Sequence, residues 1–282
     1  MIEETAEKIR RIEIQGATNV ARAALEAVKD YSKGQDTESI REGIKILKET
    51  RPTEPLMINA LRILEKLESP KAIEKRAEEL LDILKKGMDN LVEIGSRLIK
   101  NEMVVQTICH SSTVVKILVK AKQEGKDFKV ILTETRPLYQ GRRTAKELHE
   151  AGIPVTLYVD SGMYLAMKKE DVDIVLVGID AVFTDGSIAN KIGTGILALA
   201  AESLEIPVYG AGLAMKLDMG SLMAEGVTIE KRDSKEIWTY PVGVENPAFE
   251  VVPGKRIAGI ITELGVLPPA TAYMEIERHY DL

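Results

Sequence analysis

The spacing of hydrophobic positions changes near residue 102. Before that point, apolar residues recur three and four positions apart among charged ones, a pattern typical of amphipathic helices. Glycine or proline interrupts the pattern several times, and Thr53 and Ser69 are predicted to cap the helices that follow them. We therefore expect an N-terminal helical domain over residues 1–102, with helices at 5–14, 17–31, 38–49, 54–66 and 72–100.

Beyond residue 102, short runs rich in valine and isoleucine alternate with helical segments. Such runs are typical of strands that are buried on both faces. The alternation predicts an α/β fold, in which a Rossmann-like domain over residues 103–282 contains a mostly parallel sheet flanked by helices. The strands are expected at 103–108, 128–135, 154–160, 173–180, 206–212 and 257–263, and the helices at 112–124, 142–151, 161–169 and 193–204.

Four reactive side chains stand at or just after the ends of predicted strands. They are Cys109, Glu134, Asp160 and Asp180. Ligands of open α/β sheets bind beyond the carboxyl ends of the strands. We therefore expect the thiol and the three carboxylates to gather along one rim of the sheet.

Composition narrows the classes of function. A single cysteine excludes an internal disulfide framework and a thiolate-rich zinc site, and no histidine-rich spacing indicates a metal centre. The charged N-terminus is unlike a secretory leader, and no apolar stretch is long enough to predict a membrane span. A formal charge of −6 lacks the basic excess of a nucleic-acid binder. We expect a cytoplasmic protein without cofactor or metal, whose partners are neither nucleic acid nor membrane.

The only cysteine, Cys109, has two interpretations. Most free cysteines are small buried hydrophobes. Cys109, however, precedes a predicted helix start at Ser111, Ser112 and Thr113, where amides and the helix dipole lower the pKa of a thiol and attract phosphate. The same serines also suit an ordinary helix cap. We expect His110 to point away from the thiol, so no Cys–His pair is predicted.

Other candidate residues lie in the loops after the strands. Asp180 is either kept protonated by an apolar pocket or hydrogen-bonded to loop amides, and the sequence favours neither. Beyond a predicted turn at Asp185-Gly186, Lys191 precedes a glycine-rich helix start, and its ammonium could meet an anion there. Asp160 is predicted to cap a helix, and Arg136 is a candidate phosphate ligand. Neither a nucleotide-binding phosphate loop nor the dinucleotide fingerprint is present.

Taken together, residues 131–194, the later motif ITELGVLPP and the helical first part resemble a known family. This family joins regulatory subunits of the guanine-exchange initiation factor two-B to sugar-phosphate isomerases. The isomerases use a Cys–Asp pair that the regulatory subunits generally lack, and Cys109 and Asp180 match both positions. The resemblance thus favours an aldose–ketose isomerase, in which Cys109 as thiolate removes the C2 proton and protonated Asp180 supplies a proton to the ring oxygen.

Two branches of isomerases compete within this resemblance. The cysteine motif Cys-His-Ser and the segment from Glu49 to Thr53 are more similar to archaeal ribose-1,5-bisphosphate isomerases than to methylthioribose-1-phosphate isomerases. The resemblance implies conversion of ribose 1,5-bisphosphate to ribulose 1,5-bisphosphate in nucleoside-monophosphate salvage. The alternatives are the methylthioribose enzyme and a non-catalytic regulatory subunit. By resemblance, the substrate-binding residues are Gly16, Ala17, Thr18, Arg51, Ser111, Ser112, Thr113, Asn190, Lys191 and Lys216.

The chain departs from the family pattern at two places. Gln15 stands where the family typically has arginine, and the segment 212–217 reads GLAMKL instead of Ala-Glu-Thr-Tyr-Lys-Phe. The resemblance further implies a phosphorylated sugar as partner and a homo-oligomer, without distinguishing a dimer from a hexamer. Whether a nucleotide such as AMP activates the protein stays open.

Overall fold

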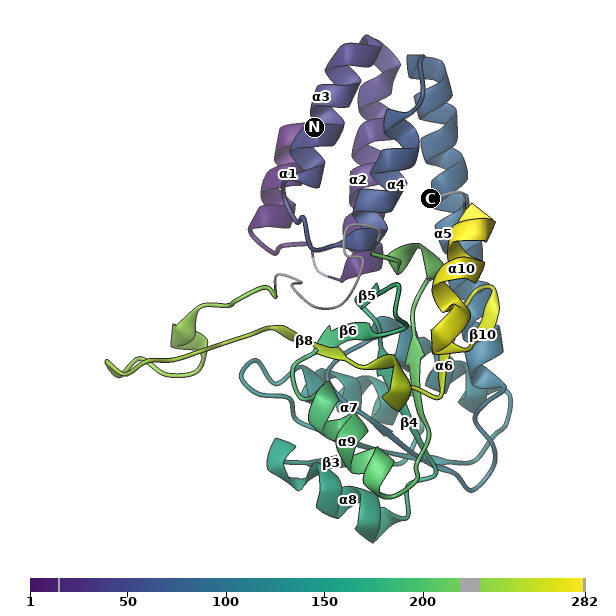
Figure 1. Cartoon of the computed structure of the whole chain (residues 1–282), viewed down its shortest axis with the longest axis vertical. Helices are drawn as coiled ribbons and strands as arrows, with labels where there is room; N and C mark the ends of the chain where they lie inside the picture. Colours follow the sequence, from purple (N-terminus) through teal and green to yellow (C-terminus); the bar gives the residue numbers. More distant parts are fainter. Residues whose placement is uncertain (15, 219–228, 281–282) are drawn as a thin grey trace.

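Five helices precede the first strand and stand side by side as a bundle (Figure 1). The computed structural model describes residues 1–14, 16–218 and 229–280. The predicted helices are confirmed with shifts of a few residues at their ends. Gln15, one of the two departures, lies outside the described residues. The helices are α1 (Ile2–Arg10), α2 (Ala17–Tyr31), α3 (Thr37–Lys48), α4 (Pro55–Glu65) and α5 (Pro70–Ser96).

One of the two predicted helix caps in this part is correct. The Ser69 side chain accepts a hydrogen bond from the amide of Ala72 and caps α5. Thr53 does not cap α4, because Glu54 occupies the cap position and makes no capping hydrogen bond with its side chain. Pro55 opens α4 instead, since its fixed φ suits the first helical position.

A seven-stranded sheet follows, in the order β10-β9-β7-β4-β1-β2-β3. All neighbouring strands pair in parallel except β10, which runs antiparallel to β9. The predicted α/β fold is thereby confirmed, including all six predicted strands. The strands are β1 (Val104–Thr107), β2 (Lys129–Thr133), β3 (Val155–Tyr158), β4 (Ile174–Gly178), β7 (Val208–Ala211), β9 (Gly259–Thr262) and β10 (Gly265–Leu267).

Helices cover both faces of this sheet. Alternate strand residues point to opposite faces, so Val130 joins one buried cluster with α5, α6 and α7, while Ile131 joins another with α8, α9 and α10. Burial on both sides explains why the strands are nearly continuous apolar runs. The helices of this part are α6 (Ser112–Gln123), α7 (Gln140–Glu150), α8 (Met163–Glu170), α9 (Thr194–Ser203) and α10 (Pro269–Tyr280).

The sequence did not predict a second, antiparallel sheet. Its strands are β5 (Ala181–Val182), β6 (Ile188–Lys191) and β8 (Phe249–Val252), in the order β5-β6-β8. The predicted turn at Asp185-Gly186 is confirmed as the connection between β5 and β6, with Gly186 at a φ of 78°. β5 is too short to show a period, and β8 reaches β6 from far along the chain.

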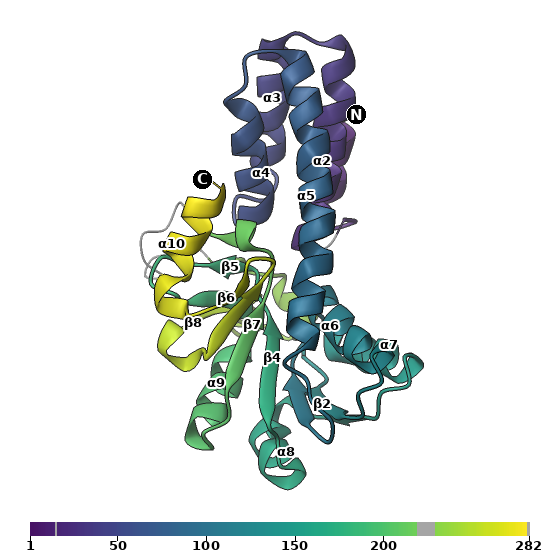
Figure 2. The same ribbon diagram turned by 90° about the vertical axis from the view of Figure 1, so that its right-hand side faces the viewer.

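The helical bundle and the sheet share one core. A buried apolar cluster runs from Ile2 in α1 to Ile261 in β9, and α5 extends from the bundle to the sheet (Figure 2). A 3₁₀ helix, η3 (Ala214–Lys216), lies against α4, where the side-chain amide of Asn59 donates to the carbonyls of Met215 and Leu217. Segments of both parts are therefore held in a fixed relation at the bundle's lower end.

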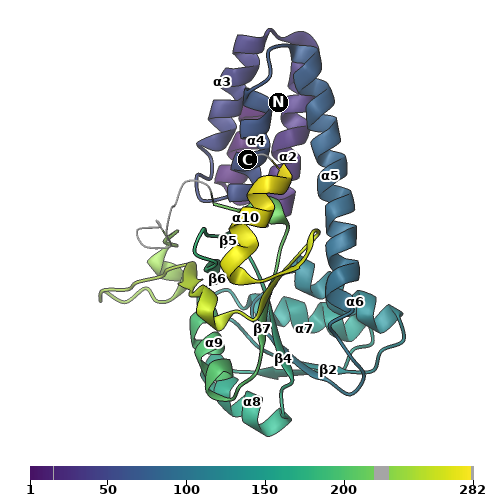
Figure 3. The same cartoon turned by 45° about the vertical axis from the view of Figure 1, so that its right-hand side comes forward.

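Figure 3 shows how the C-terminal α10 returns toward this junction, where it packs against β9, β10 and η3. In the part of the chain that the structure describes, no helix is long and apolar enough to cross a membrane. Four further 3₁₀ turns complete the connections. They are η1 (Ser32–Gly34), η2 (Asp160–Gly162), η4 (Ser234–Glu236) and η5 (Gly254–Arg256).

Candidate active site

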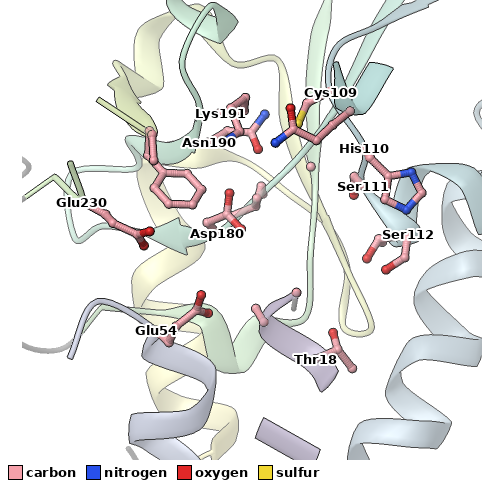
Figure 4. A pocket seen from close by; sticks show the side chains of 18 of the residues that line it. Thr18, Glu54, Cys109, His110, Ser111, Ser112, Asp180, Asn190, Lys191 and Glu230 are labelled. Atoms are coloured by element: carbon pink, nitrogen blue, oxygen red, sulfur yellow. The ribbon is translucent and has the colours of Figure 1, made fainter. Parts of the chain in front are cut away.

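A cavity of about 290 Å³ lies between the lower end of the bundle and the carboxyl ends of β1 and β4. Every residue that the resemblance assigns to catalysis or substrate binding lines it, although these residues come from widely separated segments (Figure 4). They are Gly16, Ala17, Thr18, Arg51, Cys109, Ser111, Ser112, Thr113, Asp180, Asn190, Lys191 and Lys216.

Cys109 follows β1 and is held in an unusual backbone conformation. Its φ is 62°, in the left-handed region. Its amide donates to the hydroxyl of Thr135, at 2.9 Å, and its carbonyl accepts a hydrogen bond from the hydroxyl of Thr144, at 2.8 Å. The first contact is with the loop after β2 and the second is with α7. Together they offset the cost of the strained backbone and direct the thiol toward the cavity.

The expectation that the helix start lowers the pKa of Cys109 is wrong. Burial raises the pKa of the thiol to about 11, and the opposing charge of Lys191 compensates only in part. Only 8% of the residue is exposed, so loss of hydration of the thiolate outweighs the helix dipole. The His110 ring contacts the Thr144 hydroxyl, 3.0 Å from its Nδ1 atom, and so turns toward α7 as predicted.

Asp180 follows β4 and faces the same cavity. Its amide donates to the carbonyl of Ala189 in β6, so the second sheet fixes the loop that carries it. Burial raises the pKa of the carboxyl group, against the opposing charges of Lys216, Lys191 and Arg51. The sequence left two interpretations of Asp180 open. The raised pKa agrees with the one in which an apolar pocket keeps the carboxyl group protonated.

Two helix N-termini, those of α2 and α6, border the cavity. Ser111 caps α6 through the amide of Val114, and the preceding amides of Ser112 and Thr113 have no acceptor inside the helix. Gly16, with a φ of 84°, precedes α2 and provides no side-chain cap. Because free amides and the helix dipole favour anions, both helix starts are suited to binding an anionic group.

Three cationic side chains approach the cavity from other elements. The Lys191 ammonium lies 5.1 Å from the centre of the Phe249 ring, the Lys216 ammonium donates to the carbonyl of Ile179, and Arg51 reaches in from the segment before α4. The neighbouring Asn190 donates to the hydroxyl of Thr194 at 3.0 Å, which fixes the end of β6.

The glycine-rich helix start after Lys191 is the N-terminus of α9. The amides of Gly193 and Gly195 both donate to the carboxylate of Glu250, at 2.5 and 3.0 Å. The chain's own carboxylate therefore occupies this helix N-terminus. Lys191 itself precedes this turn and lines the cavity that contains Cys109 and Asp180.

Two of the four residues expected at the rim, Glu134 and Asp160, do not line the cavity, and neither does Arg136, the candidate phosphate ligand. Glu134 pairs with Arg142 at 2.6 Å. Asp160 does not cap its own turn, because its carboxylate accepts hydrogen bonds from the amides of Thr135 and Arg136. The Arg136 guanidinium donates to the Tyr139 hydroxyl. These residues shape the loop that holds Cys109, so their contribution to the site is structural.

The sequence did not single out several charged residues of the cavity. They are Glu54, Arg143, Glu230 and Arg232. No motif or spacing links them to Cys109, because they reach the cavity from three segments that are far apart in the chain. Burial raises the pKa of Glu54 to about 7. Within the described ranges, no three histidine, cysteine, aspartate or glutamate side chains are grouped to hold a metal ion.

The chain thus combines a helical bundle and an α/β sheet, with a cavity that contains Cys109 and Asp180 between them. Comparison with known proteins identifies the family that has this architecture. The model of the Initiation factor 2 subunit family matches residues 13–269. The chain belongs to this family, which confirms the resemblance seen in the sequence.

Relatives of this chain include two kinds of isomerase. It is 37% identical over 296 residues to the ribose 1,5-bisphosphate isomerase of Methanocaldococcus jannaschii, covering 99% of this chain and 96% of that one. It is 32% identical to the methylthioribose-1-phosphate isomerase of Heliobacterium modesticaldum, over 96% and 88% of the two chains. Among solved structures, the translation initiation factor eIF-2B of Pyrococcus horikoshii superposes with a TM-score of 0.87 at 32% identity, over 95% and 97%.

Proposed function

We propose that this protein is an aldose–ketose isomerase that converts ribose 1,5-bisphosphate to ribulose 1,5-bisphosphate. The observation that carries the proposal is the cavity itself, in which Cys109 and Asp180 lie between two helix N-termini and several cations. The M. jannaschii relative, at 37% identity over nearly the full length, supports the same reaction. By resemblance, the reaction belongs to nucleoside-monophosphate salvage.

The cavity suits a sugar with two phosphates. The N-termini of α2 and α6 provide amide donors, and Arg51, Lys191 and Lys216 provide positive charge. A methylthioribose phosphate carries one phosphate and an apolar thioether, which would leave part of this polar lining without a partner. The number of anion positions therefore favours the bisphosphate over the other sugar.

The reaction requires a base and an acid at once, because an aldose with a phosphorylated anomeric oxygen cannot open to a free aldehyde. The Cys109 thiolate removes the C2 proton, and the electrons of that bond form the C1–C2 double bond. The bond between C1 and the ring oxygen breaks, and the ring oxygen takes the proton of Asp180. The thiol then returns a proton to C1, while the C2 hydroxyl gives its proton to the Asp180 carboxylate, which yields the ketose.

The pKa of Cys109 has a consequence for this mechanism. The thiolate of a thiol with a pKa of about 11 is a stronger base than an ordinary thiolate, but only a small fraction of the thiol is ionised at neutral pH. Lys191 favours the thiolate, and its charge is therefore part of the catalytic arrangement.

The substrate is tested by incubating the purified protein separately with ribose 1,5-bisphosphate and methylthioribose 1-phosphate. Ketose formation is followed by NMR. We expect turnover of the bisphosphate only. Turnover of the thioether sugar alone would assign the methylthioribose reaction. Absence of turnover with both, together with saturable nucleotide binding, would favour a regulatory subunit, the alternative suggested by the likeness to the P. horikoshii initiation factor.

A further inference from the structure

Two carboxylates already hold the guanidinium of Arg51 at the edge of the cavity. One nitrogen lies 3.3 Å from Oε1 of Glu54, and another lies 2.6 Å from Oε2 of Glu230. Figure 4 shows the side chains of Glu54 and Glu230 pointing into the same space. A phosphate that binds Arg51 must therefore compete with both carboxylates and approach their negative charge.

One oxygen of Glu54 lacks a partner. Oε2 is buried and has no hydrogen-bond partner in the described part of the chain, while the residue is only 6% exposed. A buried carboxylate oxygen without a donor is unfavourable, and most such atoms in folded proteins have a partner. Glu54 lines the cavity together with the cations Arg51, Lys191 and Lys216. Either a hydrogen bond from a ligand or protonation of the carboxyl group would remove this unfavourable state.

The charges around Glu54 oppose one another. Arg51 on its own segment and Lys216 on η3 favour its carboxylate, whereas Asp180 after β4 and Glu230 before β8 oppose it. Burial outweighs the two cations and raises the pKa of Glu54 to about 7. Its proton is therefore gained or lost in the physiological range.

We propose that Glu54 is a substrate-binding residue that acts in its protonated form. Its Oε2–H donates to a phosphate oxygen held by Arg51, and the neutral carboxyl group releases the guanidinium to the phosphate. Binding then takes up one proton from solvent. The inference rests on the proposed function only in taking a phosphorylated sugar as ligand.

The sign of the pH dependence follows from this linkage. Below about pH 7 Glu54 already carries its proton, so substrate affinity is independent of its titration. Above about pH 7 each binding event must add the proton, and the dissociation constant rises about tenfold per pH unit. The dependence belongs to binding, so KM carries it and kcat does not.

The test is calorimetric titration of the full chain with ribose 1,5-bisphosphate near pH 8, in two buffers that differ in ionisation enthalpy. At that pH a phosphate monoester is already a dianion, so proton uptake reports the protein. Cys109→Ser is present throughout to suppress turnover. We expect uptake that approaches one proton, no uptake in Glu54→Gln, and a dissociation constant for Glu54→Gln that no longer changes with pH.

Glu230→Gln is the matched control, because it removes the other carboxylate at Arg51 and leaves Glu54 in place. It should retain the uptake. The proposal is overturned if protein with Glu54 intact takes up no proton, if Glu54→Gln keeps the pH dependence, or if Glu230→Gln abolishes the uptake. The first of these outcomes needs no variant at Glu54 to fold.

Failure of this proposal differs from failure of the proposed function. Uptake that depends on Glu54 in a protein that turns over neither sugar would support the binding role and contradict the isomerase. Isomerisation with a KM that is independent of pH above about 7 would support the isomerase and contradict the binding role of Glu54.

Discussion

Cys109 combines two properties that oppose each other. The apolar surroundings raise the pKa of its thiol, while Lys191 and the nearby start of α6 favour its thiolate. The residue was recognisable from the sequence by its place after a strand and before a helix. The contacts that bury it could not be recognised, because Thr135 lies in the loop after β2 and Thr144 lies in α7, and the sequence pattern does not bring either next to Cys109.

Asp180 controls how turnover depends on pH. The mechanism needs a thiolate and a protonated carboxyl group in the same molecule. Below the pKa of Asp180 their joint population rises tenfold per pH unit, and between that pKa and the pKa of Cys109 a growing thiolate fraction offsets the loss of the acid. Turnover at saturating substrate should therefore rise, become level and fall only near the pKa of the thiol.

Asp180→Asn removes the acid and should change the shape of this profile. Turnover should be lower by about 10²–10⁴-fold and should rise tenfold per pH unit between about pH 7 and pH 10, because only the thiolate then titrates. The measurement is kcat across that range for both proteins. A variant whose profile becomes level at the same pH as that of the wild type would contradict the assigned role.

Elements differed in how well they could be predicted. The amphipathic helices and the buried parallel strands have strong periods, so α2 and β2 were predicted within a residue or two. The small sheet was missed because β5 has two residues and β8 pairs with β6 from a distant part of the chain. Yet this sheet carries Lys191 and fixes the loop of Asp180, so the missed element builds part of the candidate site.

The end of β4 requires glycine for a reason that the sequence does not show. A Cβ atom at Gly178 would lie 2.7 Å from the hydroxyl oxygen of Ser111 and 2.8 Å from its Cβ. Contacts this short cannot be accommodated unless the turn before α6 moves. Gly178 thereby allows the N-terminus of α6 to approach the strand that carries Asp180.

Gly178→Ala should therefore displace the turn at Ser111 and weaken substrate binding. We expect KM to rise about tenfold or more, which corresponds to about 1.4 kcal/mol, because the phosphate loses well-placed amides. Gly34→Ala is the matched control, since its Cβ would meet nothing within 4 Å. Equal effects on KM from the two substitutions would exclude the proposed geometry.

At the scale of the whole molecule, the site exists only where the bundle meets the sheet. Gly16 and Arg51 come from the bundle, whereas Cys109, Asp180 and Lys191 come from the sheet side. The sequence indicated both parts, and the family resemblance supplied the residues. Neither periodicity nor spacing could show that the bundle's lower end closes over the strands, because that contact is made by residues far apart in the chain.

Asn59 is a buried polar link across this junction, and its loss should weaken the contact between the two parts. Asn59→Ala removes two hydrogen bonds to the carbonyls of Met215 and Leu217 and leaves both without that donor. We expect unfolding free energy to fall by about 2–3 kcal/mol in urea titrations. KM should also rise, because Lys216 lies between the two carbonyls in the chain. Asn90→Ala, on the exposed side of α5, should change neither value.

The most direct measurement of the central claim is the turnover of Cys109→Ser with ribose 1,5-bisphosphate. Serine preserves the size of the side chain but is a far weaker base than the thiolate, so kcat should fall by about 10²–10⁴-fold or more while substrate binding persists. Turnover near that of the wild type would contradict the assignment of Cys109 as the base that removes the C2 proton.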